Sequence, residues 1–358
     1  MTAPASLAKF LSRRAARASL VILGSITLLC IFGPLFSGHS YDRVYRDYVL
    51  VRPSLLAHPA APEISQALDT ITRRLHAQIE LLRQGNDELR LTVESGNPID
   101  PRALRIFERS DVFGPAEIAN SEREGRRVAI DVALKQKVFL FGTDANGRDL
   151  FTRTLIAGRI SLAAGLLASF VALTIGVAYG AIAGYTGGRT DELMMRTVEI
   201  IYALPFIFLV IVLVMIFGRN FVLLFVAIGA VEWLDMARIV RGQALSIKQK
   251  EFVAAAEALG ASPIAILRRH IVPNASAPII AYLTILIPRV ILLESFVSFL
   301  GLGVQEPLTS WGVLVADGAR NIQGSTHLLV FPALFLGATL GALQSLGNAL
   351  HPGDGTAH

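Results

Sequence analysis

Apolar stretches, each about as long as a lipid bilayer is thick, most strongly constrain how this chain can fold. A spanning helix needs roughly 20 apolar residues. Within the bilayer, every backbone N–H and C=O must find its partner inside the segment, so these stretches are expected to be helices. The sequence predicts six, over residues 18–36, 160–185, 198–217, 221–233, 277–300 and 328–350. The fourth has an open inner boundary, because Glu232, Asp235 and Arg238 intrude near its end.

The composition agrees with an all-α, polytopic membrane protein. Of the 358 residues, 53% are hydrophobic and only 17% are charged, against about 25% charged in soluble domains. The net charge of +5 comes from basic residues near the ends of apolar stretches, where they orient membrane proteins. We therefore expect membrane lipid, and no nucleic acid, as a partner. The single cysteine, Cys30, permits neither an intramolecular disulfide nor a Cys-based metal site.

The N-terminal segment combines basic residues with the first apolar stretch. Residues 1–17 contain four basic residues and no acid: Lys9, Arg13, Arg14 and Arg17. A cleavable signal peptide is the alternative, but the apolar run is longer than a usual signal core and no small-x-small site follows before Gly38. We expect residues 1–37 to form a cytoplasmic segment and the first transmembrane helix.

Residues 38–150 are charged, punctuated by proline and without a run long enough to span. They are predicted to form one soluble, helical insertion. Apolar residues recur at helical spacing and predict an amphipathic helix from about Glu63 to Leu91. These residues are Leu68, Ile71, Leu75, Ile79 and Leu82. Such a helix either packs on its own domain or docks another subunit.

The short loops predict the orientation. The segment between the fourth and fifth stretches is rich in Lys and Arg, whereas that between the fifth and sixth has Arg320 against Glu306 and Asp317. Because basic residues favour the cytoplasmic side, both termini are expected in the cytoplasm and residues 38–150 outside. The transmembrane core is then residues 151–351, with a cytoplasmic loop over 238–276 and a tail over 352–358.

Local signals divide this cytoplasmic loop into two helices. Ser246 with Gln249 predicts a capping box that begins the first helix, and Gly260 predicts its left-handed end. The Ser-Pro pair at residues 262–263 begins the second helix, and Pro273 prevents its continuation.

The first of these helices has a shallow apolar face. Phe252, Ala255, Ala256 and Leu259 are spaced i, i+3, i+4 and i+7. This face suits docking into the groove of a partner. It equally suits packing against the ends of the membrane spans, and periodicity alone leaves both interpretations open.

The same segment resembles the EAA loop of binding-protein-dependent ABC importer permeases. The match consists of residues 254–256, all alanine, then Gly260 after three intervening residues, then His-Ile-Val-Pro at 270–273. Ala254 stands where the family name implies glutamate. Three further stretches, FGTDANGRDLFTRTLIAGRISL, GYTGGRTDELMMR and ESFVSFLGLGVQEPLTSWG, resemble the C-type permease of dipeptide and oligopeptide importers in order and interval. The resemblance covers roughly residues 139–347.

The resemblance implies a type I ABC importer permease fold in the bacterial inner membrane. The importer would contain this subunit, a second permease as a heterodimeric partner, two cytoplasmic ATPases and an external solute-binding protein. The residues implied to contact the ATPase are Phe252, Ala254, Ala255, Ala256, Leu259 and Gly260. The solute stays open among peptides, nickel complexes and other small solutes.

The chain is not predicted to be an enzyme or to hold a cofactor. It contains no GxxxxGK[ST] phosphate loop, so ATP is expected to be used by partner subunits. A membrane-embedded enzyme would need a catalytic pair at membrane depth, and a stand-alone transporter would show an inverted repeat or paired broken spans. Neither pattern is evident. A calcium loop at Asp144, Asn146 and Asp149 is rejected because Gly147 and Leu155 do not fit the ligand spacing, and no metal is expected.

Two charged residues lie within the fifth stretch. Arg289 follows Pro288, and Glu294 is five residues further on. Ionisable groups at membrane depth usually face an interior or a water-filled path. Both residues are therefore candidates for the translocation path, with structural pairing to another span as the alternative. The five-residue gap places them on different faces, so they are not expected to pair with each other.

Overall fold

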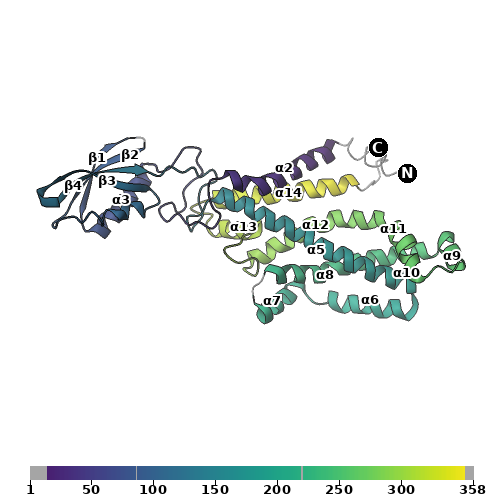
Figure 1. Ribbon diagram of the computed structural model, residues 1–358. Coiled ribbons are helices and arrows are strands. Elements are labelled where there is room, and N and C mark those ends of the chain that lie inside the picture. Colours follow the sequence, from purple (N-terminus) through teal and green to yellow (C-terminus); the bar gives the residue numbers. More distant parts are fainter. Residues whose placement is uncertain (1–13, 86, 219–220, 351–358) are drawn as a thin grey trace. The chain divides into compact units, whose positions relative to one another are not determined.

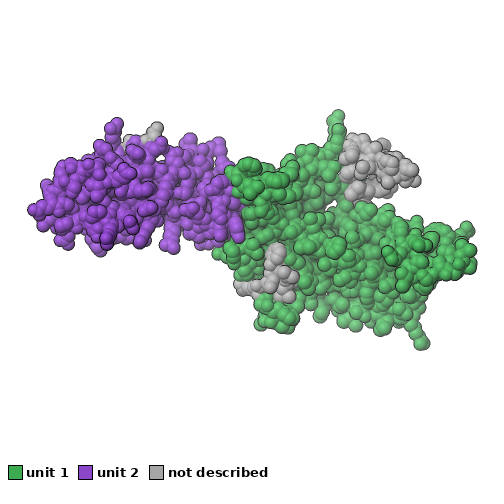
Figure 2. Space-filling view, viewed as in Figure 1, with its two compact units in different colours: residues 1–36, 154–320, 329–358 green, residues 37–153, 321–328 purple. Residues whose placement is uncertain are grey.

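The computed structural model describes residues 14–85, 87–218 and 221–350, and the chain divides into two compact units (Figures 1 and 2). We call residues 1–36, 154–320 and 329–358 the helical unit, and residues 37–153 and 321–328 the α/β unit. The predicted tail over 352–358 lies outside the described residues.

Long helices and a short helical loop make up the helical unit and its connections. In chain order the elements are α2 (Arg14–Phe36), α5 (Leu150–Thr186), α6 (Gly188–Tyr202), α7 (Phe206–Phe217), α8 (Phe221–Lys248), α9 (Glu251–Ala258), α10 (Pro263–Ile266), the π-helix η2 (Leu267–Ile271), α11 (Val272–Asn274), α12 (Ser276–Phe299), α13 (Trp311–Arg320) and α14 (His327–Leu350).

The described helices support most of the predicted spans. Within residues 14–350, α2, α5, α12 and α14 are long and apolar enough to cross a membrane, and α6 with α7 passes as a bent fifth span. The 28-residue helix α8 covers the predicted fourth span and continues through its three charged residues. A sixth crossing by α8 stays a prediction.

The third predicted span is broken rather than kinked. The sequence predicts one span over residues 198–217, a range that contains Pro205. Instead α6 and α7 meet at an angle of 78°, and Pro205 precedes α7 in an extended conformation, with φ −61° and ψ 124°. A proline disfavours the helical region for the residue before it and cannot donate a backbone hydrogen bond. These two effects end α6 and begin a new helix.

Glycines allow α5 to lie directly against α8. A Cβ atom on Gly176, Gly180 or Gly184 would overlap atoms of α8, including the backbone of Ala237 and the carbonyl of Arg241. These small residues allow the close approach of the two helix backbones. Side chains from α5, α8 and α12 fill the surrounding cores.

The first helix is fastened to α5 by an arginine. Pro34 lies inside α2 and cannot donate to the carbonyl of Cys30, four residues earlier. Arg159 of α5 donates to that carbonyl through Nε at 2.6 Å and to the carbonyl of Ile31 through Nη2 at 2.6 Å. The arginine thus satisfies a backbone acceptor that the proline leaves open.

The α/β unit contains a four-stranded antiparallel sheet in the order β1-β2-β4-β3 (Figure 1). Its elements are α3 (Ala61–Leu75), β1 (Gln78–Gln84), β2 (Glu88–Glu94), the short helix α4 (Arg105–Glu108), β3 (Phe113–Glu122), the 3-10 turn η1 (Arg123–Gly125) and β4 (Arg127–Leu134). Alternate residues of β2 and β4 pack with apolar residues of α3 in one core.

The predicted helical insertion is therefore wrong in part. The helix ends at Leu75, where His76 takes a left-handed conformation with φ 50°, and residues 78–94 form a hairpin. Leu89, Leu91 and Val93 are all fully buried, which is the period of two of a strand. The apolar spacing of residues 68–82 predicted one continuous helix, although the helix ends at Leu75 and a strand begins at Gln78. The sequence Gly-Asn-Asp at 85–87 was the missed turn signal.

Candidate functional site

The predicted ATPase contact lies on the short helix α9. It begins at Glu251, after Lys250 as an N-cap without a side-chain capping bond. The predicted capping box at Ser246 is wrong, because α8 continues through Lys248. Ala244 and Ile247 pack in the core beside Ile266 and Ile271, and this tertiary packing overrides the local capping signal.

The turn after α9 agrees with the sequence. Gly260 has φ 79°, which confirms its left-handed conformation, and the Ser262 hydroxyl accepts from the Ala265 N–H at 3.3 Å, which confirms that cap. The predicted stop at Pro273 is wrong. The chain passes from α10 through η2 into α11 and α12, since a π turn within a helical path can absorb a distortion that a regular helix cannot.

The two sides of α9 differ in exposure. Val253 is fully buried, and Ala256 is half-buried against the same core. The opposite side carries Phe252, Ala255 and Leu259, with Leu259 89% exposed. We call these three residues the outer face of α9. Of the other predicted contact residues, Ala254 and Gly260 are exposed, whereas Ala256 belongs mainly to the inner side.

Polar contacts fasten α9 to the end of α5. The Tyr185 hydroxyl donates to Glu257 Oε1 at 3.1 Å, and Lys248 Nζ donates to the Tyr185 carbonyl at 2.5 Å. Nearby, Arg241 forms a two-pronged pair with Asp191 of α6, with both N–O distances 2.6 Å. Sequence reasoning missed these contacts, because the partners are 50 to 72 residues apart and carry no local signal.

Arg289 is held between two acids of α8. Its Nη1 lies 3.0 Å from Asp235 Oδ2, and its Nε lies 3.6 Å from Glu232 Oε1. The arginine side chain is 46% exposed, whereas that of Glu232 is 2% exposed. We call these residues the α8–α12 triad. With all three ionised, its net charge is −1. We had read the two acids as the end of a span, so their pairing with Arg289 was missed.

A cavity of about 320 Å³ lies beside Arg289, between α12 and α14. Thr284 and Pro288 of α12 line it together with Gln344 and Asn348 of α14. Amide and hydroxyl groups can hydrogen-bond to a polar solute. Arg289 therefore borders a partly polar space within the helical unit.

Glu294 does not line an open space. It is fully buried, and its carboxyl group accepts from Ser298 Oγ at 2.7 Å and from Ser161 Oγ at 3.3 Å. Ser161 also accepts from the Trp311 N–H at 3.2 Å. Hydroxyl groups from α5 and α12 enclose it, which supports the structural alternative, and its place on the translocation path stays a prediction. The prediction that Arg289 and Glu294 do not pair with each other is confirmed, since Arg289 is held by acids of α8 and Glu294 by serines.

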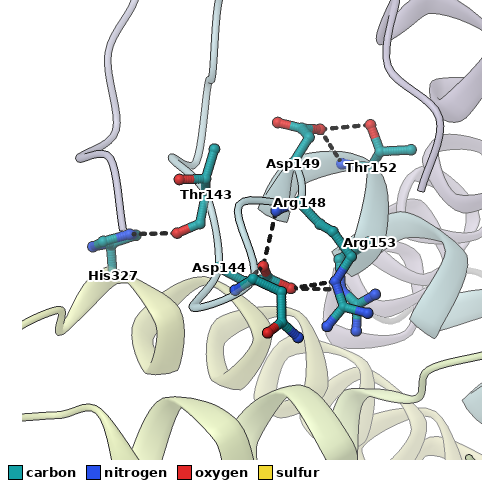
Figure 3. Close-up of polar contacts among 8 residues, drawn as sticks. Thr143, Asp144, Arg148, Asp149, Thr152, Arg153 and His327 are labelled. Carbon is teal, nitrogen blue, oxygen red and sulfur yellow. Dashed lines mark hydrogen bonds and ion pairs between the residues drawn. The ribbon is translucent and has the colours of Figure 1, made fainter. Parts of the chain in front are cut away.

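In the α/β unit, the stretch GTDANGRD forms a compact turn before α5 (Figure 3). Asp144 lies 2.8 Å from Arg148 Nε and 3.3 Å from Arg153 Nε. Asp149 caps the first turn of α5 by accepting from the Thr152 N–H at 2.8 Å and from its hydroxyl at 2.5 Å. Burial raises the pKa of Asp149, and the Thr152 hydrogen bonds oppose that shift. These contacts fix where α5 begins.

Comparison with known proteins identifies two family segments. Residues 176–351 match the family described as binding-protein-dependent transport system inner membrane component. Residues 6–59 match the N-terminal TM domain of oligopeptide transport permease C. The first match covers α8, the loop that carries α9, and α12.

Curated relatives are similar over much of their length. The oligopeptide transport system permease protein OppC of Haemophilus influenzae is 54% identical over 210 residues, which is 59% of this chain and 68% of that protein. The dipeptide transport system permease protein DppC of Bacillus subtilis is 46% identical over 211 residues, 59% of this chain and 66% of that protein.

Among solved structures, an inward facing conformation of the MetNI methionine ABC transporter is similar with a TM-score of 0.46 and 19% sequence identity, over 54% of this chain and 91% of that one. The family matches and the apolar helices together describe a multi-pass inner membrane protein. The chain belongs to the family of binding-protein-dependent transport system inner membrane components, as a permease of its oligopeptide and dipeptide branch.

Proposed function

We propose that this chain and a second permease subunit form the translocation path of a peptide importer in the bacterial inner membrane. Two cytoplasmic ATPases supply the energy, and an external solute-binding protein delivers the peptide. Peptides are favoured because the relatives are named as oligopeptide and dipeptide transport permeases. ATP is used by the partner subunits, and this chain carries out no chemistry of its own.

The proposed topology places both termini and α9 in the cytoplasm, and residues 38–150 outside. Its support is the distribution of Lys and Arg between the loops. The loop over residues 238–276 contains the last part of α8, with Arg238 and Arg241, and the basic pair Arg268 and Arg269.

The outer face of α9 is the observation that carries the proposed ATPase contact. Phe252 is 43% exposed on the eight-residue helix α9, and Leu259, its C-cap residue, is 89% exposed. Large apolar side chains gathered on an exposed helix face mark a docking surface. Val253 anchors the inner side of α9, and Glu257 binds Tyr185 at the end of α5. A displacement of α9 by a partner would therefore be passed to the spans.

The α8–α12 triad is the proposed polar part of the translocation path. A half-exposed arginine at membrane depth needs a polar environment, and the neighbouring cavity supplies amide groups from Gln344 and Asn348. Peptides carry a carboxylate at one terminus and an ammonium group at the other. Arg289 can contact the first, and the acids of the triad can contact the second. Glu294 has no part in this proposal.

A charge placed on the outer face of α9 tests the ATPase contact. Ala255→Arg should reduce co-purification of the ATPase and solute-stimulated ATP hydrolysis at least about tenfold, because a buried unpaired charge costs several kcal/mol at an interface. Ala119→Arg makes the same change at an exposed position of β3 and should affect neither. Wild-type binding and hydrolysis with Ala255→Arg would show that this face does not contact the ATPase.

A further inference from the structure

An apolar groove of about 670 Å³ lies on the helical unit, and its described lining residues belong neither to the outer face of α9 nor to the triad. It is bordered by α5, by α10 and η2, and by the first turns of α12. Leu173 and Ala181 of α5 and Leu283 of α12 contribute to its apolar wall. Among the described residues that line it, Arg268 is the charged one.

The groove has the length of one leaflet of a bilayer. Its lining runs along α5 from Leu173 to Ile182, which at 1.5 Å per residue is about 14 Å. Half of a hydrocarbon core is about 15 Å thick. A spanning helix of another protein would need roughly twice this length. An acyl chain matches the groove better than such a helix does.

The charge lies at one end of this groove. Arg268 is exposed and belongs to η2, which leads through α11 into the first turn of α12. Leu173 of α5 and Leu283 of α12 line the part of the groove that is more distant from the first turn of α12. The groove therefore has an apolar length and a cationic end, which is complementary to an amphiphile with an anionic headgroup.

We propose that this groove binds an anionic phospholipid of the cytoplasmic leaflet, with an acyl chain along α5 and α12 and the headgroup phosphate on Arg268. A guanidinium group can donate two parallel hydrogen bonds to a phosphate. The inference rests on the proposed topology, which places η2 on the cytoplasmic side. Because Leu267 and Arg268 lie in the same helical loop as α9, nine and ten residues after its end at Ala258, the lipid would brace the segment that carries the ATPase contact.

The experiment compares two neighbouring arginines. The complete complex is delipidated and titrated with phosphatidylglycerol or phosphatidylcholine, and bound lipid is counted by native mass spectrometry. Arg268→Gln should weaken phosphatidylglycerol binding about tenfold, as expected for loss of a hydrogen bond to a charged group. Arg269→Gln removes the same charge from an exposed residue that does not line the groove and should bind like wild type.

A second variant tests the apolar part. Ala178 lines the groove and is exposed, so Ala178→Trp should fill it and reduce the binding of both lipids, while ATPase co-purification shows that the complex is intact. Equal losses from Arg268→Gln and Arg269→Gln would overturn the proposal in favour of diffuse surface charge. Loss of the second permease from Ala178→Trp would also overturn it, since the groove would then hold a protein segment. If the wild-type complex binds the ATPase but does not prefer phosphatidylglycerol, the lipid proposal fails while the proposed function stands.

Discussion

Two charged side chains on α12, five residues apart, have opposite surroundings. Arg289 is 46% exposed and is held by acids of α8 beside a partly polar cavity. Glu294 is fully buried and is held by serine hydroxyl groups. Both are charged residue types at membrane depth, which by itself suggests a transport role. Their exposure separates them, because the side chain of Arg289 is half-exposed beside a cavity and that of Glu294 is enclosed.

Reversing the charge at the enclosed position should have the largest effect. Glu294→Lys would place a cation at a site whose described partners are serine hydroxyl groups, at a cost of about 3–5 kcal/mol. We expect loss of the folded protein in a thermal unfolding assay of the purified chain. Glu294→Gln retains a hydrogen-bond acceptor and should cost only about 1 kcal/mol. A well-folded Glu294→Lys variant would contradict the enclosed position of this residue.

At the open position, Arg289→Gln should separate assembly from transport. The complex should still form, because Gln can occupy the half-exposed site, while solute uptake should fall about tenfold or more from loss of a charge-assisted contact.

The double variant Glu232→Gln with Arg289→Gln sharpens this prediction. It removes one acid together with the arginine and keeps the net charge of the triad at −1. If the triad serves only structure, the double variant should recover both stability and uptake. If Arg289 lines the path, stability should recover while uptake stays low, as measured by thermal unfolding and by flux in reconstituted vesicles.

The sequence predicts the helical unit much better than the α/β unit. Apolar length alone places the long helices, because the bilayer allows few alternatives. Gly260 and Ser262 were predicted correctly, since each acts on its immediate backbone. The hairpin at residues 78–94 was missed, because a helical spacing and a strand alternation can share the same leucines until the turn is recognised.

The sequence located the candidate site but did not separate its outward-facing residues from those that pack in the core. Helical spacing placed Ala255 and Ala256 on one face of α9, whereas the structure turns Ala256 toward the core and Ala255 outward. The acids that hold Arg289 come from another helix, more than 50 residues away in the sequence. Such differences depend on tertiary packing, which a single sequence does not contain.

The central claim is that the outer face of α9 contacts the ATPase, and site-specific photo-crosslinking tests it most directly. Leu259 is 89% exposed, and Ile118 of β3 is 47% exposed. A photoreactive residue at either position can therefore reach a partner. In the assembled complex, position 259 should capture the ATPase and position 118 should not. No ATPase captured from position 259, in a complex that contains the ATPase, would contradict the account.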